Sequence, residues 1–365
     1  MIRQWIGRFI RHIDSILLAT VLMVLVVALM VLYSASGQSL TKVNAQIINI
    51  MIMMCVMLLV ANTQPQLIER IALPVYLFGL TLLLAVALVG DISHGARRWL
   101  NLGVTKIQPS ELMKLAVPIM LSWYFSKRET MLRAGDYLVA GVILLIPVIL
   151  IAKQPDLGTA TLVFASGFFV IFLAGLSWKF IFGSAIAFGA ALPILWSMLH
   201  DYQRRRVEIL IDPSQDPLGA GYHIIQATIA IGSGGTTGKG WLNGTQSQLD
   251  FVPERTTDFI FAVFAEEFGL VGCSLLLLLF TIIIGRAFII ASQAKNTFSR
   301  LLAGSIAATF FTYCFVNMGM VSGILPVVGI PLPLVSYGGT SLLTLGLSLG
   351  LLMSVQTHKR LVATD

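Results

Sequence analysis

The chain has 365 residues, of which 57% are hydrophobic and only 11% are charged, whereas charged residues make up about 25% of an ordinary soluble domain. This composition excludes a cytosolic or secreted globular protein. The formal net charge is +7, but basic residues that flank membrane spans serve first as topology signals and lipid contacts, so this charge does not indicate nucleic-acid binding.

Apolar runs of nearly the ~20 residues that a helix needs to cross a bilayer follow one another along the chain. These runs are continuous rather than alternating, which excludes a transmembrane barrel. The three cysteines lie inside such runs, which excludes a disulfide framework. Hydropathy predicts ten spans, at 16–34, 45–62, 71–90, 110–126, 137–152, 157–176, 178–200, 258–285, 301–322 and 338–356. We therefore expect an all-α polytopic membrane protein with a single domain over residues 1–365.

The first residues are basic and amphipathic, with Arg3, Arg8 and Arg11 among apolar side chains. The apolar run that follows is too long for a cleaved signal peptide, so we expect an uncleaved first span preceded by a segment at the cytoplasmic interface. Ten spans place both termini in the cytoplasm. Lys and Arg then predominate in the short inner loops, as the positive-inside rule requires.

The outer loops nevertheless carry more cations than topology needs. They are Arg97, Arg98 and Lys106 in one loop, Lys153 in another, and the arginine cluster at 204–206 in the longest. One interpretation is that these side chains are solvated or contact lipid headgroups. The other is a site for an anionic substrate, because clustered Arg and Lys bind phosphate and pyrophosphate well. Charge alone leaves both interpretations open.

The outer loop at about 201–257 is too long for a passive connection and is rich in glycine. Its apolar stretch at 222–231 is too short to span, so we expect an interfacial or re-entrant segment. The glycines at 232–240 miss the spacing of a phosphate-binding P-loop, with Ser233 and Gly240 at the wrong positions. They predict only a backbone that can approach a ligand closely.

Asp258 lies where this loop enters the eighth predicted span. Steps of three or four residues from Asp258 reach Ala262, Ala265 and Gly269, a stripe of small residues that would turn the carboxylate toward the protein interior. An interior carboxylate in a membrane protein is a candidate functional group. The alternative is a helix cap, for which Thr256 and Thr257 compete.

Other polar residues accompany the predicted spans. On an ideal helix Glu266 and Glu267 point about 80° and 180° away from Asp258, so we expect one of them to pair with a cation on another helix. Glu111 and Lys114 share one face of the fourth span and can form a neutralising pair or support Asp258. Asn317 is expected to form an interhelical hydrogen bond.

Several segments together resemble the SEDS family (shape, elongation, division and sporulation). They are DPSQDPLGAGYH at 212–223, GKGWL at 238–242, TQSQ at 245–248, PERTTDFIFA at 253–262 and AEEFG at 265–269, with GARRW at 95–99, QPSELMK at 108–114, KQPDLG at 153–158 and PLPLVSYGG at 331–339. The short termini and the Gln-Ser-Gln sequence are more similar to the elongation branch. One departure is Thr256, where the family more often has histidine.

The resemblance implies a peptidoglycan glycosyltransferase that polymerises lipid II, the undecaprenyl-pyrophosphate disaccharide-pentapeptide. It implies the bacterial cytoplasmic (inner) membrane, with the active site facing the periplasm or cell exterior. The implied partners are a class B penicillin-binding protein (a transpeptidase), other membrane proteins of the elongation complex, and membrane lipid. A lipid II flippase and a non-catalytic scaffold are the alternatives.

Inverting transfer from a pyrophosphate donor needs a base and positive charge at the leaving group. We expect Asp258 to be the base. Cations, or a divalent metal such as Mg²⁺ or Mn²⁺, are expected at the pyrophosphate, and Asp258 is also the candidate metal ligand. The candidate substrate contacts are Arg97, Arg98, Glu111, Lys114, Asp156, Arg204, Lys239 and Arg255.

Overall fold

The computed structural model describes residues 14–93, 96–101, 106–128, 132–198, 201–216, 219–249 and 251–359. The predicted interfacial segment at residues 1–13 lies outside this part of the chain. The helices are α2 (Ser15–Ala35), α3 (Leu40–Ala61), α4 (Pro65–Arg70), α5 (Ala72–Val89), α6 (Pro109–Ser126), α7 (Ala134–Ala152), α8 (Leu157–Leu173), α9 (Trp178–Met198), α10 (Asp201–Ile211), η1 (Pro213–Gln215), α11 (Ala220–Gly234), α12 (Thr245–Gln248), α13 (Ile260–Ser292), α14 (Thr297–Val321) and α15 (Gly339–Lys359).

All ten ranges predicted to span coincide with helices. Within the described residues, seven helices are long and apolar enough to cross a membrane, namely α2, α3, α5, α7, α13, α14 and α15. The other three fall short for different reasons. Helix α8 has 17 residues and the apolar part of α9 ends at Pro193, whereas α6 carries Glu111 and Lys114 and is less hydrophobic.

The connection between α5 and α6 corrects the all-α prediction. Strands β1 (Asp91–Ser93), β2 (Ala96–Asn101) and β3 (Lys106–Ile107) form a small antiparallel sheet in the order β1-β2-β3. Asp91 lies opposite Trp99, and Leu100 lies opposite Ile107. Trp99 is aromatic and Ile107 is β-branched, and residues of these kinds favour strands. A search for long apolar runs nevertheless does not detect strands of two to six residues.

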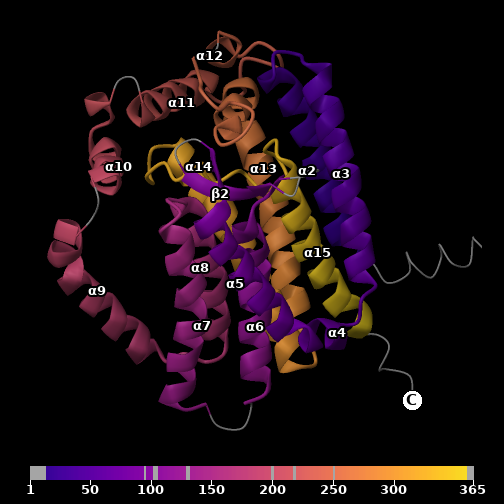
Figure 1. Ribbon diagram of the computed structural model, residues 1–365. Coiled ribbons are helices and arrows are strands. Elements are labelled where there is room, and N and C mark those ends of the chain that lie inside the picture. The colour runs from indigo at the N-terminus through magenta and orange to yellow at the C-terminus, as the bar shows by residue number, and fades with distance from the viewer. Residues whose placement is uncertain are drawn as a thin grey trace, which may run out of the picture.

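The long helices form one bundle in which α15 packs along α3 and α13 contacts α2, α11 and α14. Leu17, Val21 and Val24 form part of the buried face of α2, at the spacing expected for one side of a helix. Helices α11 and α12 lie together at one end of the bundle, and α4 lies at the other (Figure 1). The apolar stretch at 222–231, predicted to be interfacial or re-entrant, belongs to α11.

Candidate active site

Asp258 lies in a turn that precedes α13, rather than on the helix itself. The helix begins at Ile260 and has non-helical backbone at Gly269, so the small-residue stripe predicted from Asp258 does not exist as a continuous helical face. The turn has its own hydrogen bonds, because the backbone N–H groups of Thr257 and Phe259 donate to the Glu254 carbonyl at 3.0 and 3.2 Å.

Three consecutive carbonyls of this turn are bound by donors that come from much later in the chain. The Tyr337 N–H donates to the Thr256 carbonyl at 2.9 Å, the Ser336 hydroxyl to that of Thr257 at 2.6 Å, and the Asn317 side-chain amide to that of Asp258 at 2.9 Å. These donors lie on α14 and on the segment between α14 and α15. They fix the backbone of the turn without using the Asp258 carboxylate.

The carboxylate of Asp258 faces Gly329, which has a φ of +73°. A Cβ atom added at Gly329 would lie 3.4 Å from Asp258 Oδ2. Burial, together with the nearby Glu254 carboxylate, raises the pKa of Asp258 to about 6. No hydrogen bond or ion pair to this carboxylate comes from the described residues. It is therefore suited to accept a proton near neutral pH.

The start of α8 packs against the segment that borders Asp258. A Cβ atom at Gly158 would lie 2.5 Å from the Val328 carbonyl oxygen, so only glycine permits this approach. Asp156 caps α8 by accepting from the Thr159 N–H at 3.2 Å, and it also accepts from the Gln108 amide at 2.9 Å. The structure thus gives Asp156 protein partners close to this segment.

The two predicted arginines of the 91–107 connection lie on β2. Arg98 donates to the Pro155 carbonyl, which places it beside the start of α8. The backbone of Arg97 belongs to the same strand, but its side chain lies outside the described part of the structure.

Glu111 and Lys114 form the predicted pair, with Lys114 Nζ 2.6 Å from Glu111 Oε1. Thr344 on α15 donates to Glu111 at 3.1 Å, and Lys114 Nζ lies 5.3 Å from the ring centre of Tyr313 on α14. The pair therefore joins α6 to two other helices inside the bundle. Its contribution to substrate binding or to Asp258 stays a prediction.

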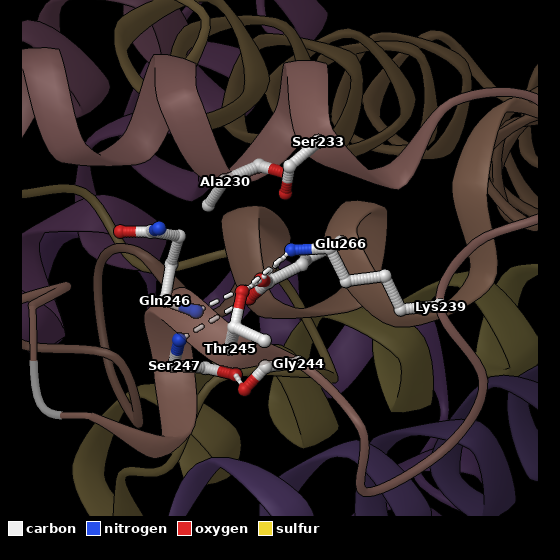
Figure 2. Close-up of polar contacts among 8 residues, drawn as sticks. All are labelled: Ala230, Ser233, Lys239, Gly244, Thr245, Gln246, Ser247 and Glu266. Carbon is white, nitrogen blue, oxygen red and sulfur yellow. Dashed lines mark hydrogen bonds and ion pairs between the residues drawn. The ribbon is translucent and has the colours of Figure 1, made fainter.

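Glu266 anchors the segment at 239–248. Lys239 Nζ lies 2.8 Å from Glu266 Oε1 and 2.7 Å from the Thr245 hydroxyl, and the N–H groups of Gln246 and Ser247 donate to Glu266 at 2.9 and 3.1 Å (Figure 2). One glutamate of the pair does meet a cation, as predicted. The cation, however, comes from the loop and not from another helix.

The glycine-rich segment after α11 docks into the break in α13. The N–H groups of Lys239 and Gly240 each donate at 3.0 Å to the carbonyls of Glu266 and Glu267, and Leu270 and Val271 donate back to residues 235 and 236. A Cβ atom at Gly269, where φ is +61°, would lie 2.3 Å from the Gly238 nitrogen. The glycines therefore allow two backbones to meet and satisfy the polar groups freed by the break.

The remaining predicted cations are spread over the loop. Arg255 donates to the Ser247 carbonyl, so it contacts α12, as Lys239 does through Thr245. Arg204 lies on α10 and donates to the Ser197 carbonyl at 2.6 Å. The structure brings Lys239 and Arg255 to one segment and leaves Arg204 apart from them.

The donor groups around Asp258 are few for a metal site. Within the described ranges, no three His, Cys, Asp or Glu side chains come together as a metal-binding group. Asp258 has one neighbouring carboxylate, that of Glu254. Two carboxylates are fewer than a closed protein site requires, so a metal ion bound here would need further ligands from outside the chain.

Comparison with known proteins identifies the family. The family model FtsW/RodA/SpoVE, described as cell cycle protein, matches residues 9–361. Peptidoglycan glycosyltransferase MrdB of Escherichia coli strain K12 is 50% identical over 353 residues, which are 96% of this chain and 95% of MrdB. Stage V sporulation protein E of Bacillus subtilis strain 168 is 35% identical over 292 residues, 79% of each chain.

Two solved structures share the fold. A chain from a peptidoglycan synthase complex that coordinates polymerization and crosslinking has a TM-score of 0.85 and 32% identity, covering 95% of this chain and 98% of that one. Rod shape determining protein RodA of Thermus thermophilus has a TM-score of 0.71 and 28% identity, covering 97% and 98%. The resemblance predicted from the motifs is confirmed, and the chain belongs to the FtsW/RodA/SpoVE family of cell cycle proteins.

Proposed function

We propose that this chain is a peptidoglycan glycosyltransferase that polymerises lipid II, with Asp258 as the catalytic base. The observation that carries the proposal is a carboxylate with a pKa of about 6 on a turn whose carbonyls are bound from another part of the fold. A base with a pKa near the working pH transfers protons efficiently. The name of MrdB, which is 50% identical, supports the same activity.

In the proposed step, a sugar hydroxyl of the acceptor attacks the anomeric carbon of the lipid-linked donor. A glycosidic C–O bond forms and the C–O bond to pyrophosphate breaks, so the polyprenyl pyrophosphate leaves with the electron pair. The hydroxyl proton passes to the Asp258 carboxylate. A single displacement converts an α-linked donor into a β-linked product, which requires one base and no covalent sugar intermediate.

Positive charge at the leaving pyrophosphate is the second requirement of this chemistry. Arg97, Arg98, Arg204, Lys239 and Arg255 are the candidates, with Glu111, Lys114 and Asp156 as supporting contacts to substrate. If Mg²⁺ or Mn²⁺ takes part, Asp258 and Glu254 are the side chains placed to hold it, and the ion would stabilise the pyrophosphate charge. The remaining ligands would come from substrate and water.

We place the protein in a bacterial cytoplasmic membrane, with ten spans and cytoplasmic termini. The end of the bundle that carries α11, α12 and Asp258 then faces the periplasm or cell exterior. The similarity to a chain of a peptidoglycan synthase complex supports a class B penicillin-binding protein as partner. Other elongation-complex proteins and membrane lipid complete the proposed surroundings.

The test is polymerisation of labelled lipid II by the purified protein with its transpeptidase partner. Asp258→Asn and Asp258→Ala should give no glycan strands. Asp212→Asn, which changes a partly exposed carboxylate bonded within its own turn, should retain the wild-type rate. Folding and partner binding are compared by melting temperature and co-purification. Strands from all variants would remove Asp258 from catalysis, and lipid II movement across vesicles without strands would indicate a flippase.

A further inference from the structure

Asn317 on α14 connects the two segments that border the Asp258 carboxylate. Its side chain is 0% exposed. One amide N–H group donates to the Asp258 carbonyl at 2.9 Å and the other to the Ile330 carbonyl at 2.7 Å. The same nitrogen therefore holds the turn that carries the carboxylate and the segment that includes Gly329. This differs from the interhelical bond expected from the sequence, because both acceptors lie outside the helices.

The chemistry of these contacts requires an amide. Two carbonyl acceptors must face the NH₂ group, since an amide oxygen in that position would repel them. The Asn317 oxygen is left buried and has no partner in the described part of the chain. A buried orphan acceptor costs free energy, so an apolar residue would be the better choice if this position served packing alone.

The geometry that Asn317 controls lies at the proposed base. Gly329 stands next to Ile330 in the chain, and its Cα faces Asp258 Oδ2 closely enough that a Cβ atom would lie at 3.4 Å. The surroundings of this carboxylate therefore depend on the separation between its own turn and the segment that includes Gly329. Holding both carbonyls on one nitrogen fixes that separation.

We infer that Asn317 is a positioning residue for the glycosyl transfer, acting through the backbone of Asp258 and Ile330 without touching substrate. The inference rests on the proposed role of Asp258 as base. Because a displacement of about 1 Å at a reacting group can cost about 100-fold in rate, Asn317→Ala should lower kcat by about that factor. The KM for lipid II should change by less than about threefold, since no substrate contact is removed.

The matched control is Ser305→Ala. Ser305 lies on the same helix, is also 0% exposed, and donates to the Ser166 carbonyl of α8 at 2.6 Å. Its substitution likewise removes a buried hydrogen bond from α14, but at a distance from the proposed base. Asn317→Asp is the second test variant, because it keeps the shape of the side chain while a carboxylate can donate to neither carbonyl and a protonated carboxyl group to only one.

The experiment measures kcat and KM for lipid II polymerisation per folded molecule, using the full chain with its transpeptidase partner. A large fall in kcat for both Asn317 variants, a nearly unchanged KM, and a wild-type kcat for Ser305→Ala are expected. A normal kcat in folded Asn317→Ala would overturn the inference, as would equal losses in Ser305→Ala. Failure of both Asn317 variants to fold while Ser305→Ala folds would also overturn it, because the residue would then serve the fold.

An Asp258→Asn sample measured alongside separates this inference from the proposed function. If Asp258→Asn is inactive and Asn317→Ala has the wild-type kcat, the positioning role fails and the base assignment stands. If Asp258→Asn keeps the wild-type rate, the base assignment fails and the positioning role fails with it.

Discussion

The rate of glycan polymerisation should depend on the ionisation of Asp258, because only the carboxylate can take the proton of the attacking hydroxyl. Burial and the Glu254 carboxylate raise the pKa of Asp258 to about 6. The ionised fraction is then about 90% at pH 7 and about 10% at pH 5. We therefore expect kcat at pH 5 to be about one tenth of its plateau value.

Glu254→Gln tests the physical origin of this midpoint. The negative charge of Glu254 disfavours the ionised form of Asp258. Because the substitution removes this charge, the pKa of Asp258 should fall below 6. Burial is the larger cause and remains, so the pKa should stay above the ordinary value of 3.8. The turn should persist, because the bonds from Thr257 and Phe259 go to the Glu254 backbone carbonyl.

The measurement is the initial rate at saturating lipid II between about pH 4.5 and 8.5 for wild type, Glu254→Gln and Glu69→Gln. Glu69 provides the matched charge control, since it binds Lys127 at 2.9 Å near α4, at the other end of the bundle from α12 (Figure 1). Only Glu254→Gln should retain a larger share of its plateau rate at pH 5. The reasoning is refuted if its midpoint equals that of wild type, or if Glu69→Gln shifts equally.

Three further substitutions test the surroundings of the site. Asp258→Asn should raise the free energy of unfolding by about 3 kcal/mol at pH 7.5 and leave it unchanged near pH 3.5. The reason is that a pKa raised from 3.8 to about 6 makes ionisation unfavourable in the folded state. Melting temperatures at the two pH values check this. Glu266→Gln should cost roughly 3 kcal/mol, because it breaks a buried ion pair, and should speed amide exchange at Gln246. Gly158→Ala should lower the free energy of unfolding by about 1–3 kcal/mol, because the new Cβ atom would clash with the Val328 carbonyl oxygen. Gly141→Ala is the control and should not destabilise the protein, because no atom lies within 4 Å of the added Cβ.

The positions of the long helices could be predicted from hydropathy, because a helix that faces lipid needs an apolar surface over its whole length. The sheet at 91–107 could not be predicted in this way, since its strands have only two to six residues. Their pairing is set by contacts between strands and not by long apolar runs in the sequence. Helix α13 extends to Ser292, beyond the predicted end at 285. The break at Gly269 also escaped prediction, because it depends on a loop that returns to the helix from residues 235–240.

Asp258 could be identified from the sequence as a carboxylate at the entrance to a span, and the family motif strengthened that choice. The surroundings of Asp258 could not be predicted, because the donors to its turn come from far along the chain. Asn317 lies 59 residues after Asp258, and Ser336 lies 79 residues after Thr257. Asn317 illustrates the limit. A polar residue in an apolar run indicates a buried hydrogen bond, but the run does not say whether the acceptor is a helix or a loop.

The arrangement around Asp258, the proposed catalytic base, reconciles two demands that oppose each other at such a group. A base must be held in a fixed position, yet each hydrogen bond donated to a carboxylate stabilises its charge and lowers its pKa. Here the donors from Asn317, Ser336 and Tyr337 go to backbone carbonyls of the turn, not to the side chain. The position is therefore fixed through the backbone while the carboxylate keeps a pKa of about 6, so its affinity for the proton of an attacking hydroxyl is retained.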